Sequence, residues 1–200
     1  MFDRVGKAEL TARILVVGDF HIPSRAKNVP DKIKRVMSSL NFDLVLCTGD
    51  LVDEWVLRML NKLGKHVKWV MGNMDYIAGP REVVVDVHGF KIGLVHGDGI
   101  FPRGDPAKLY ELASRMGVHV LVSGHTHALS ITLVKGRLLL NPGSTTGVWG
   151  GGPASLKPSL IILEVKPGFL TVKGYELEGK KLNVVTKTYK KVNEKLIEVR

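Results

Sequence analysis

The sequence predicts an α/β protein built as a four-layer α-β-β-α sandwich, with two mixed β-sheets flanked by helices. In the first two thirds of the chain, short apolar runs alternate with helix-like stretches, which is the pattern of β-α units stacked around a sheet. From about residue 130 the helical period disappears and strand-like runs follow one another. The 200 residues are 44% hydrophobic and can bury the core of a single domain spanning residues 1–200.

The first elements are predicted from apolar runs, which read as strands, and from amphipathic stretches, which read as helices. In chain order they are strand 13–19, helix 30–40, strand 43–50, helix 55–64 and strand 67–73. In the first helix Ile33, Val36, Met37 and Leu40 share one face. Gly64 is expected to end the second helix, since glycine is the usual residue after a helix C-terminus.

The pattern in the middle of the chain predicts a hairpin and a third helix. Within "EVVVDVHGFKIGLVHGD", residues 82–98, two strands join tightly around His88 and Gly89. The helix at 105–117 starts with Asp105 as its N-cap and Pro106 in its first turn. A strand at 118–125 follows, and the later strands are predicted at 130–143, 159–165, 169–179 and 182–190.

A long glycine-rich connection, "NPGSTTGVWGGGPASLKP", spans residues 141–158. Compact domains seldom keep such a segment unless it borders a site. Trp149 in its middle is either a lid residue or part of a disordered loop.

The formal net charge of +10 is shared between two parts of the chain. The motif-bearing core is predicted at about residues 13–165. A strand-rich extension, about 166–200, carries 9 basic and 4 acidic residues, against 20 and 15 before it. The extension lacks the aromatic and arginine interleaving of single-stranded nucleic-acid surfaces, so a solvated basic face is favoured and nucleic acid is not the favoured partner.

Localisation and redox state follow from hydropathy and cysteine content. No apolar run reaches the roughly 18–20 residues that span a bilayer, and "MFDRVGKAEL" has no apolar signal region, so we expect a cytoplasmic protein without membrane contact. The single cysteine, Cys47, excludes an intramolecular disulfide and reads as a small core hydrophobe.

Potential metal ligands follow directly on five of the apolar runs. They are Asp19, His21, Asp50, Asn73, His96, His125 and His127. If these strands are parallel neighbours, the ligands meet at one edge of a sheet, because strand carboxyl ends line a shared crevice. Glycines before the ligands (Gly18, Gly49, Gly72 and Gly124) are expected to let the backbone turn sharply into the site.

Seven ligands are too many for one four-coordinate ion and suit two ions that share a carboxylate. Carboxylate, carboxamide and imidazole without thiolate favour divalent transition metals, with manganese expected first and nickel, iron or zinc as alternatives. Asp19 with His21, and His125 with His127, are two residues apart and can act as pincers.

The motifs "GDFH", "GDLVD", "GNMD", "VHGD" and "GHTH", in this order, resemble the calcineurin-like metallophosphoesterase superfamily. The resemblance covers residue 13 to the "NPGS" at 141–144 and points to the small phosphodiesterase branch, which also contains the eukaryotic retromer scaffold subunit. It implies one ion on Asp19, His21, Asp50 and His127, and another on Asp50, Asn73, His96 and His125. Asp19, Asp50, Asn73 and His96 would be catalytic, acting through a metal-bridging hydroxide on a small phosphodiester or nucleotide.

One position departs from the family pattern. Larger relatives have "GNHE", whose histidine protonates the leaving group, and here that position is Met74. A thioether cannot serve as a general acid, so good leaving groups would suffer least. Asp53, Asp75 and Asp98 are candidates for orienting the ligands, against an equal expectation that they are helix caps or turn residues.

Two other functions remain open. A non-catalytic scaffold like the retromer subunit is disfavoured because that subunit has lost ligand residues retained here, His21 and Asn73 among them. A nuclease would use the basic extension to hold DNA or RNA. Arg25, Arg81 and Arg103 lie in loops that could face a phosphate, and a strand edge leaves a homo-oligomer open.

Overall fold

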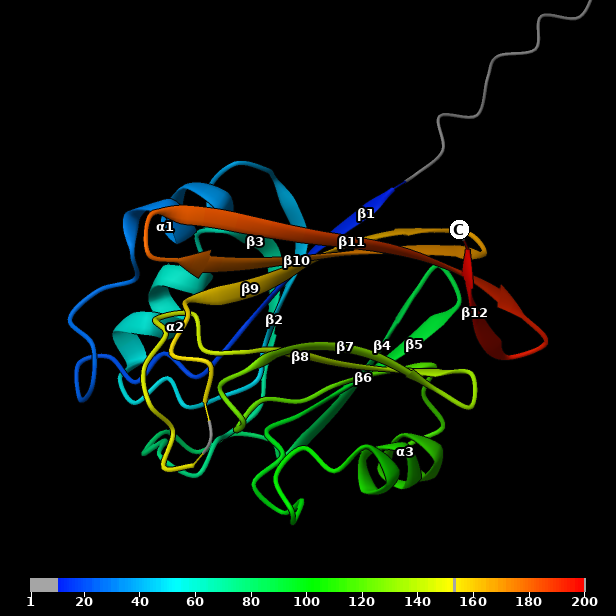
Figure 1. Cartoon of the computed structure of the whole chain (residues 1–200), viewed down its shortest axis with the longest axis horizontal. Coiled ribbons are helices and arrows are strands. Elements are labelled where there is room, and N and C mark those ends of the chain that lie inside the picture. Colours follow the sequence, from blue (N-terminus) through cyan, green and yellow to red (C-terminus); the bar gives the residue numbers. More distant parts are fainter. Residues whose placement is uncertain (1–10, 153, 200) are drawn as a thin grey trace, which may run out of the picture.

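The computed structural model describes residues 11–152 and 154–199, which form two β-sheets packed face to face (Figure 1). The seven-stranded sheet has the order β12-β11-β10-β9-β1-β2-β3 and the five-stranded sheet the order β4-β5-β6-β8-β7. In chain order the strands are β1 Ala12–Val17, β2 Phe42–Cys47, β3 Gly64–Trp69, β4 Glu82–Val87, β5 Phe90–Val95, β6 Val120–Val122, β7 Leu129–Val134, β8 Arg137–Pro142, β9 Ser159–Lys166, β10 Phe169–Glu178, β11 Lys181–Val192 and β12 Lys195–Val199.

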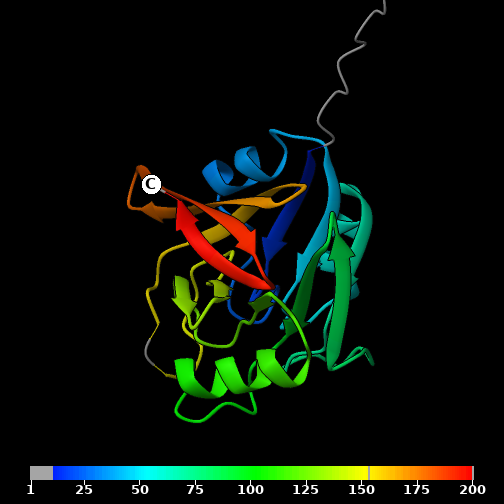
Figure 2. The same ribbon diagram turned by 90° about the vertical axis from the view of Figure 1, so that its right-hand side faces the viewer.

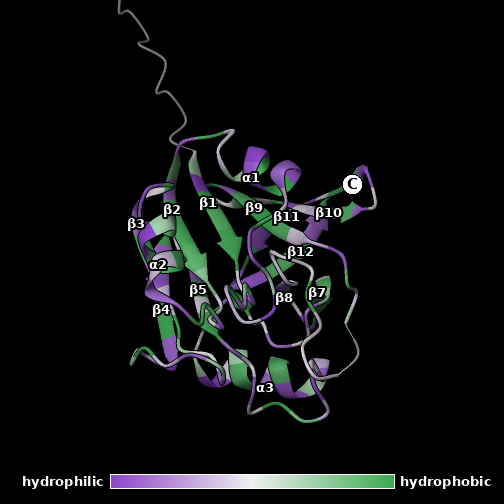
Figure 3. Ribbon diagram, turned by 90° about the vertical axis from the view of Figure 1, so that its left-hand side faces the viewer, coloured by the Kyte–Doolittle hydropathy of each residue, from purple (hydrophilic) through white to green (hydrophobic). Residues whose placement is uncertain are grey.

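Alternation along the strands divides the core into layers. In β1, Ile14 and Val16 face the other sheet, while Leu15 and Val17 face the helices on the outside. Figure 3 shows the resulting apolar colour along the central strands. The inner layer between the sheets has the most buried residues of the three apolar clusters among the described residues, so the central strands of both sheets are buried.

Three helices cover the outer faces of the sheets. Helices α1, Asp31–Met37, and α2, Glu54–Leu60, pack on the seven-stranded sheet. Helix α3, Pro106–Arg115, covers the five-stranded sheet, and Figure 2 shows it on the side of the molecule opposite α1. The four-layer α-β-β-α sandwich is therefore confirmed. None of the helices in the described ranges is long and apolar enough to cross a membrane.

Local signals in the sequence are borne out where they concern caps and turns. Asp105 caps α3 by accepting hydrogen bonds from the amides of Ala107 and Lys108 at 2.9 and 3.0 Å. The β4-β5 hairpin turns at His88 and Gly89, which both have positive φ.

Some predicted elements differ from the structure. The strand predicted at 130–143 is two antiparallel strands, β7 and β8, which turn at Lys135 and Gly136. The helix predicted at 55–64 ends at Leu60, and Gly64 opens β3 instead, where it pairs with Phe42 and leaves no room for a Cβ beside Val45. Strand β12 was missed, because it is short and only Leu196 among its residues is buried. The basic segment from residue 166 contributes β10, β11 and β12 to the seven-stranded sheet and pairs with the strands of the core.

The strands that precede the ligands are divided between the two sheets. β1, β2 and β3 are parallel neighbours in the seven-stranded sheet, and β5 and β6 are parallel neighbours in the five-stranded sheet. The expectation of a single shared edge was therefore wrong. The carboxyl ends of both parallel sets lie at the same end of the sandwich, where the long loops gather (Figure 1).

Candidate metal centre

The loops after the strands present the ligands in a strained conformation. Five of the seven residues have positive φ, from 47° to 66°: Asp19, His21, Asp50, His125 and His127. This conformation costs a non-glycine residue on the order of 1 kcal/mol, so surrounding contacts must enforce it. The preceding glycines serve close packing more than turning. Of these four only Gly49 has positive φ, whereas a Cβ on Gly18 would lie 1.8 Å from Thr48 Oγ1.

One half of the cluster is buried and compact. Ligand atoms of Asp19, His21, Asp50 and His127 all lie within 4.8 Å of one another. His21 Nε2 is 3.2 Å from both Asp50 Oδ2 and His127 Nε2, and His127 Nε2 is 3.4 Å from Asp19 Oδ1. These nitrogen and oxygen atoms lie close enough together to hold one metal ion.

The other half gathers near the same aspartate from both sheets: Asn73 follows β3 of the seven-stranded sheet, whereas His96 and His125 follow β5 and β6 of the five-stranded sheet. His96 Nε2 lies 3.6 Å from Asp50 Oδ2 and 3.0 Å from Asn73 Oδ1. The His125 ring stands edge-on to the His96 ring, with centroids 5.1 Å apart. Asn73 is the exposed member, so this half opens to solvent. All seven residues predicted from the sequence thus come together, with Asp50 between the two halves.

Hydrogen bonds fix which nitrogen of two imidazoles faces the cluster. His96 Nδ1 donates to the Thr48 carbonyl at 2.8 Å, and His127 Nδ1 donates to the Val148 carbonyl at 2.7 Å. In the neutral imidazole the Nε2 atom then carries a free lone pair, as a metal ligand requires.

The electrostatics of the buried groups calls for a cation. Burial, helped by neighbouring charges, lowers the pKa of His125 and of His127 to about 4, so both rings are neutral at pH 7. Burial and the nearby Asp50 raise the pKa of Asp19 well above its ordinary range. Burial opposes ionisation of Asp50 too, but His21, His96 and the Met74 amide together lower its pKa to about 2. Lone pairs and carboxylates facing one another fit divalent metal ions of the borderline class.

The three aspartates proposed to support the ligands have different surroundings. The Asp75 carboxylate accepts hydrogen bonds from the amides of Asp50, Val52 and Gly72, each at 2.8 Å. It thereby holds Asp50 and Val52, whose φ values of 52° and 75° are both positive. Asp53 caps α2 and is exposed.

Asp98 is also exposed and forms an ion pair with Arg81 at 3.2 Å. Among the described residues, therefore, only Asp75 of the three makes hydrogen bonds to the loops that carry the ligands. Met74 uses its backbone amide, which donates to Asp50 Oδ1 at 2.8 Å.

Sequence reasoning missed the parts of the site that consist of backbone. Consecutive carbonyls of Val148, Trp149 and Gly150 accept hydrogen bonds from His127, Arg25 and Arg103, at 2.7, 2.8 and 2.8 Å. We call residues 148–150 the carbonyl row. Carbonyls carry no residue code, and the glycine-rich run around them was the available signal.

Buried hydroxyls support the loop after β1. Ser144 Oγ donates to the Asp19 carbonyl at 2.7 Å, Thr146 Oγ1 donates to the Phe20 carbonyl at 2.8 Å, and Thr145 Oγ1 accepts from the Gly18 amide at 3.1 Å. The segment "GSTT" thus ties the end of β8 to the loop that carries Asp19 and His21. Its signal in the sequence was the "NPGS" motif.

Comparison with known proteins gives consistent matches. Residues 13–168 match a family model described as the calcineurin-like phosphoesterase superfamily domain. The probable metallophosphoesterase MJ0623 of Methanocaldococcus jannaschii is 44% identical over 136 residues, which cover 68% of this chain and 69% of that protein.

Two solved structures extend the similarity to most of the fold. Vacuolar Protein Sorting 29 from Cryptosporidium parvum has a TM-score of 0.88 at 30% identity, covering 92% of this chain and 100% of that one. Wild-type Vps29 from Entamoeba histolytica complexed with Zn²⁺ has a TM-score of 0.81 at 33% identity, covering 87% and 97%.

Proposed function

Because the chain belongs to the calcineurin-like phosphoesterase superfamily, we propose that it is a metal-dependent phosphodiesterase acting on small phosphodiesters or nucleotides. The observation that carries this proposal is the convergence of six side chains able to bind metal, from loops of both sheets, around Asp50. A fold alone would not support an activity, whereas a cluster of side chains suited to bind metal does.

The arrangement fits two divalent ions with Asp50 between them. One ion would take Asp19, His21, Asp50 and His127, and the second Asp50, Asn73, His96 and His125, with manganese as the first expectation. Zinc is the ion named for the Entamoeba relative and is an alternative. When bound, such ions activate water and withdraw charge from phosphate oxygens.

The chain's own residues would orient the metal ligands and limit which substrates react. The bonds from His96 and His127 to backbone carbonyls keep both rings in the ligating tautomer. Met74 provides no proton for the departing alkoxide, so esters with acidic leaving groups, such as aryl or nucleoside esters, are the expected substrates.

The test is hydrolysis of bis-p-nitrophenyl phosphate beside p-nitrophenyl phosphate, after metal removal and return of manganese, nickel, zinc or magnesium singly. Turnover of the diester above the monoester, restored by metal, would support the proposal. Asp50→Ala should lower kcat/KM by more than about 100-fold and reduce the bound metal, since losing even an outer partner of a ligand costs about 10–100-fold. Asp53→Asn, an exposed helix cap, is the matched control and should retain both.

A second function is favoured by the similarity to Vacuolar Protein Sorting 29. In that case the same fold would be a non-catalytic scaffold that binds a protein partner. Absence of turnover with every metal, in protein shown by elemental analysis to hold two ions, would favour the scaffold over the enzyme. Cleavage of DNA or RNA with steep salt dependence would instead favour the nuclease.

A further inference from the structure

Two arginines from distant loops are held by neighbouring atoms of one segment. Arg25 Nη1 donates to the Trp149 carbonyl and Arg103 Nη1 donates to the Gly150 carbonyl, both at 2.8 Å. The preceding carbonyl of the same row, that of Val148, holds His127. The carbonyl row therefore fixes two guanidinium groups relative to a member of the metal-ligand cluster.

Neither arginine forms an ion pair with a carboxylate among residues 11–152 and 154–199. This distinguishes them from two other arginines beside the site, because Arg81 pairs with Asp98 at 3.2 Å and Arg115 pairs with Glu82 at 2.5 Å. A guanidinium has five N–H donors, and a bond to one carbonyl leaves most of them and the whole charge available. Two guanidinium groups that form no ion pair and are held by carbonyl oxygens are suited to bind an anion that comes from outside the protein.

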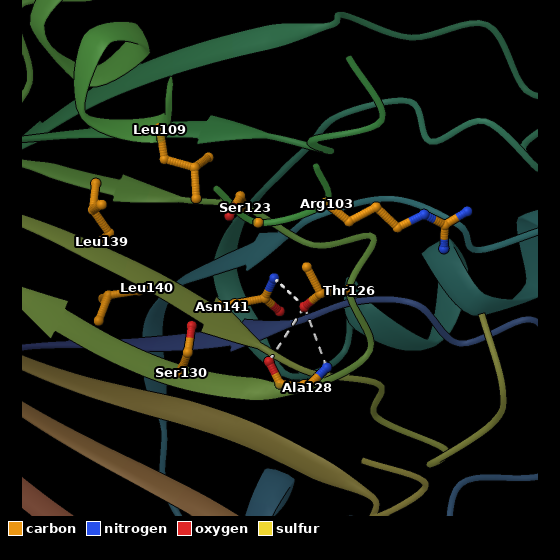
Figure 4. Close-up of a pocket in the computed structure, with 10 residues that line it drawn as sticks. Arg103, Leu109, Ser123, Thr126, Ala128, Ser130, Leu139, Leu140 and Asn141 are labelled. Carbon is orange, nitrogen blue, oxygen red and sulfur yellow. Dashed lines mark hydrogen bonds between the residues drawn. The ribbon is translucent and has the colours of Figure 1, made fainter. Parts of the chain in front are cut away.

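The two guanidiniums occupy successive positions along the row. Arg25 is held one carbonyl, and Arg103 two carbonyls, beyond the Val148 carbonyl that holds His127. Figure 4 shows the Arg103 side chain directed away from the pocket lined by Thr126 and Asn141. Its guanidinium lies instead along the glycines after the carbonyl row, where a Cβ on Gly152 would be 3.2 Å from Nη1.

We propose that Arg25 and Arg103 are substrate-binding residues that hold the phosphate oxyanion beside the metal-ligand cluster, and that the carbonyl row fixes their positions. This assignment rests on the proposed function, since it takes the ligand to be a phosphate ester. Arginine suits the role because its planar fork binds two oxygens of one phosphate at once.

The probe is inorganic phosphate, titrated calorimetrically into the manganese-loaded protein. Arg25→Ala and Arg103→Ala should each weaken phosphate binding about 10-fold, the effect of losing a charge-assisted hydrogen bond, and the double variant should weaken it further. Arg25→Lys should recover part of the loss. Manganese affinity should stay unchanged, because neither side chain is a ligand. Arg81→Ala is the control, with its charge already paired.

The same variants are assayed with bis-p-nitrophenyl phosphate, where KM should rise more than kcat falls. Phosphate binding that is absent from the wild type, unchanged in both arginine variants, or weakened equally in Arg81→Ala would overturn the assignment. Failure of the proposed function gives a different result: the wild type and all variants lack turnover, while phosphate binding still depends on Arg25 and Arg103.

Discussion

The effect of replacing Asp75 by asparagine can be predicted from the hydrogen bonds of its carboxylate. Its Oδ2 accepts the amides of Asp50 and Gly72, and its Oδ1 accepts the amide of Val52. Asp75→Asn keeps the shape of the side chain but leaves one acceptor oxygen. Whichever way the amide turns, an amino group then faces a backbone N–H.

The cost follows from the number of bonds affected. With the oxygen placed toward Asp50 and Gly72, the Val52 amide loses its acceptor, which costs about 1–3 kcal/mol. The two remaining bonds lose their charge assistance, at roughly 0.5–1 kcal/mol each. The free energy of unfolding should therefore fall by about 3 kcal/mol, and Tm by about 9 °C for a chain of this length.

The measurement is urea unfolding followed by tryptophan fluorescence in chelator, so that metal binding does not contribute. Asp53→Asn is the matched control, because asparagine caps a helix about as well as aspartate and the same charge is removed. Manganese affinity should also fall in Asp75→Asn and not in the control, since the loop that carries Asp50 loses its anchor. Equal unfolding midpoints and equal manganese affinities in the two variants would refute the reasoning.

Two further predictions concern packing and pH. Gly150→Ala places a Cβ 2.5 Å from a ring carbon of His127 and should weaken manganese binding at least about 10-fold. The control Gly99→Ala, whose Cβ meets nothing within 4 Å, should leave manganese binding unchanged. Both affinities are measured by calorimetric titration of manganese. The hydrogen bond from His119 at 2.7 Å lowers the pKa of Glu194 below its ordinary value of 4.5, so this contact stabilises the fold above that pH and is lost as pH falls through the lowered pKa. The difference in urea midpoint between wild type and Glu194→Gln should therefore shrink at acidic pH, and a difference that is the same at pH 7 and pH 3 would contradict this.

The sequence predicted the parts of the fold and site that depend on side-chain type. Alternation in β1 and the polar residues after each strand are local signals, and they predicted the layers and the candidate ligands. Which sheet each strand joins depends on long-range pairing, so the division of Asp50 and His96 between two sheets could not be read from either strand. The carbonyl row could not be predicted, because every residue has a carbonyl. Only the path of the folded loop directs these three carbonyls toward His127, Arg25 and Arg103.

The division of the candidate ligands between the two sheets determines how the stability of the fold would depend on metal. Asp19, His21, Asp50 and Asn73 follow strands of one sheet, and His96, His125 and His127 follow strands of the other. Ions bound among them would act as a staple between the two halves of the sandwich, adding about 4 kcal/mol of stability when free metal exceeds its dissociation constant 1,000-fold. The amount of folded protein would then follow the supply of metal, and starvation for that metal would remove the protein as well as its activity.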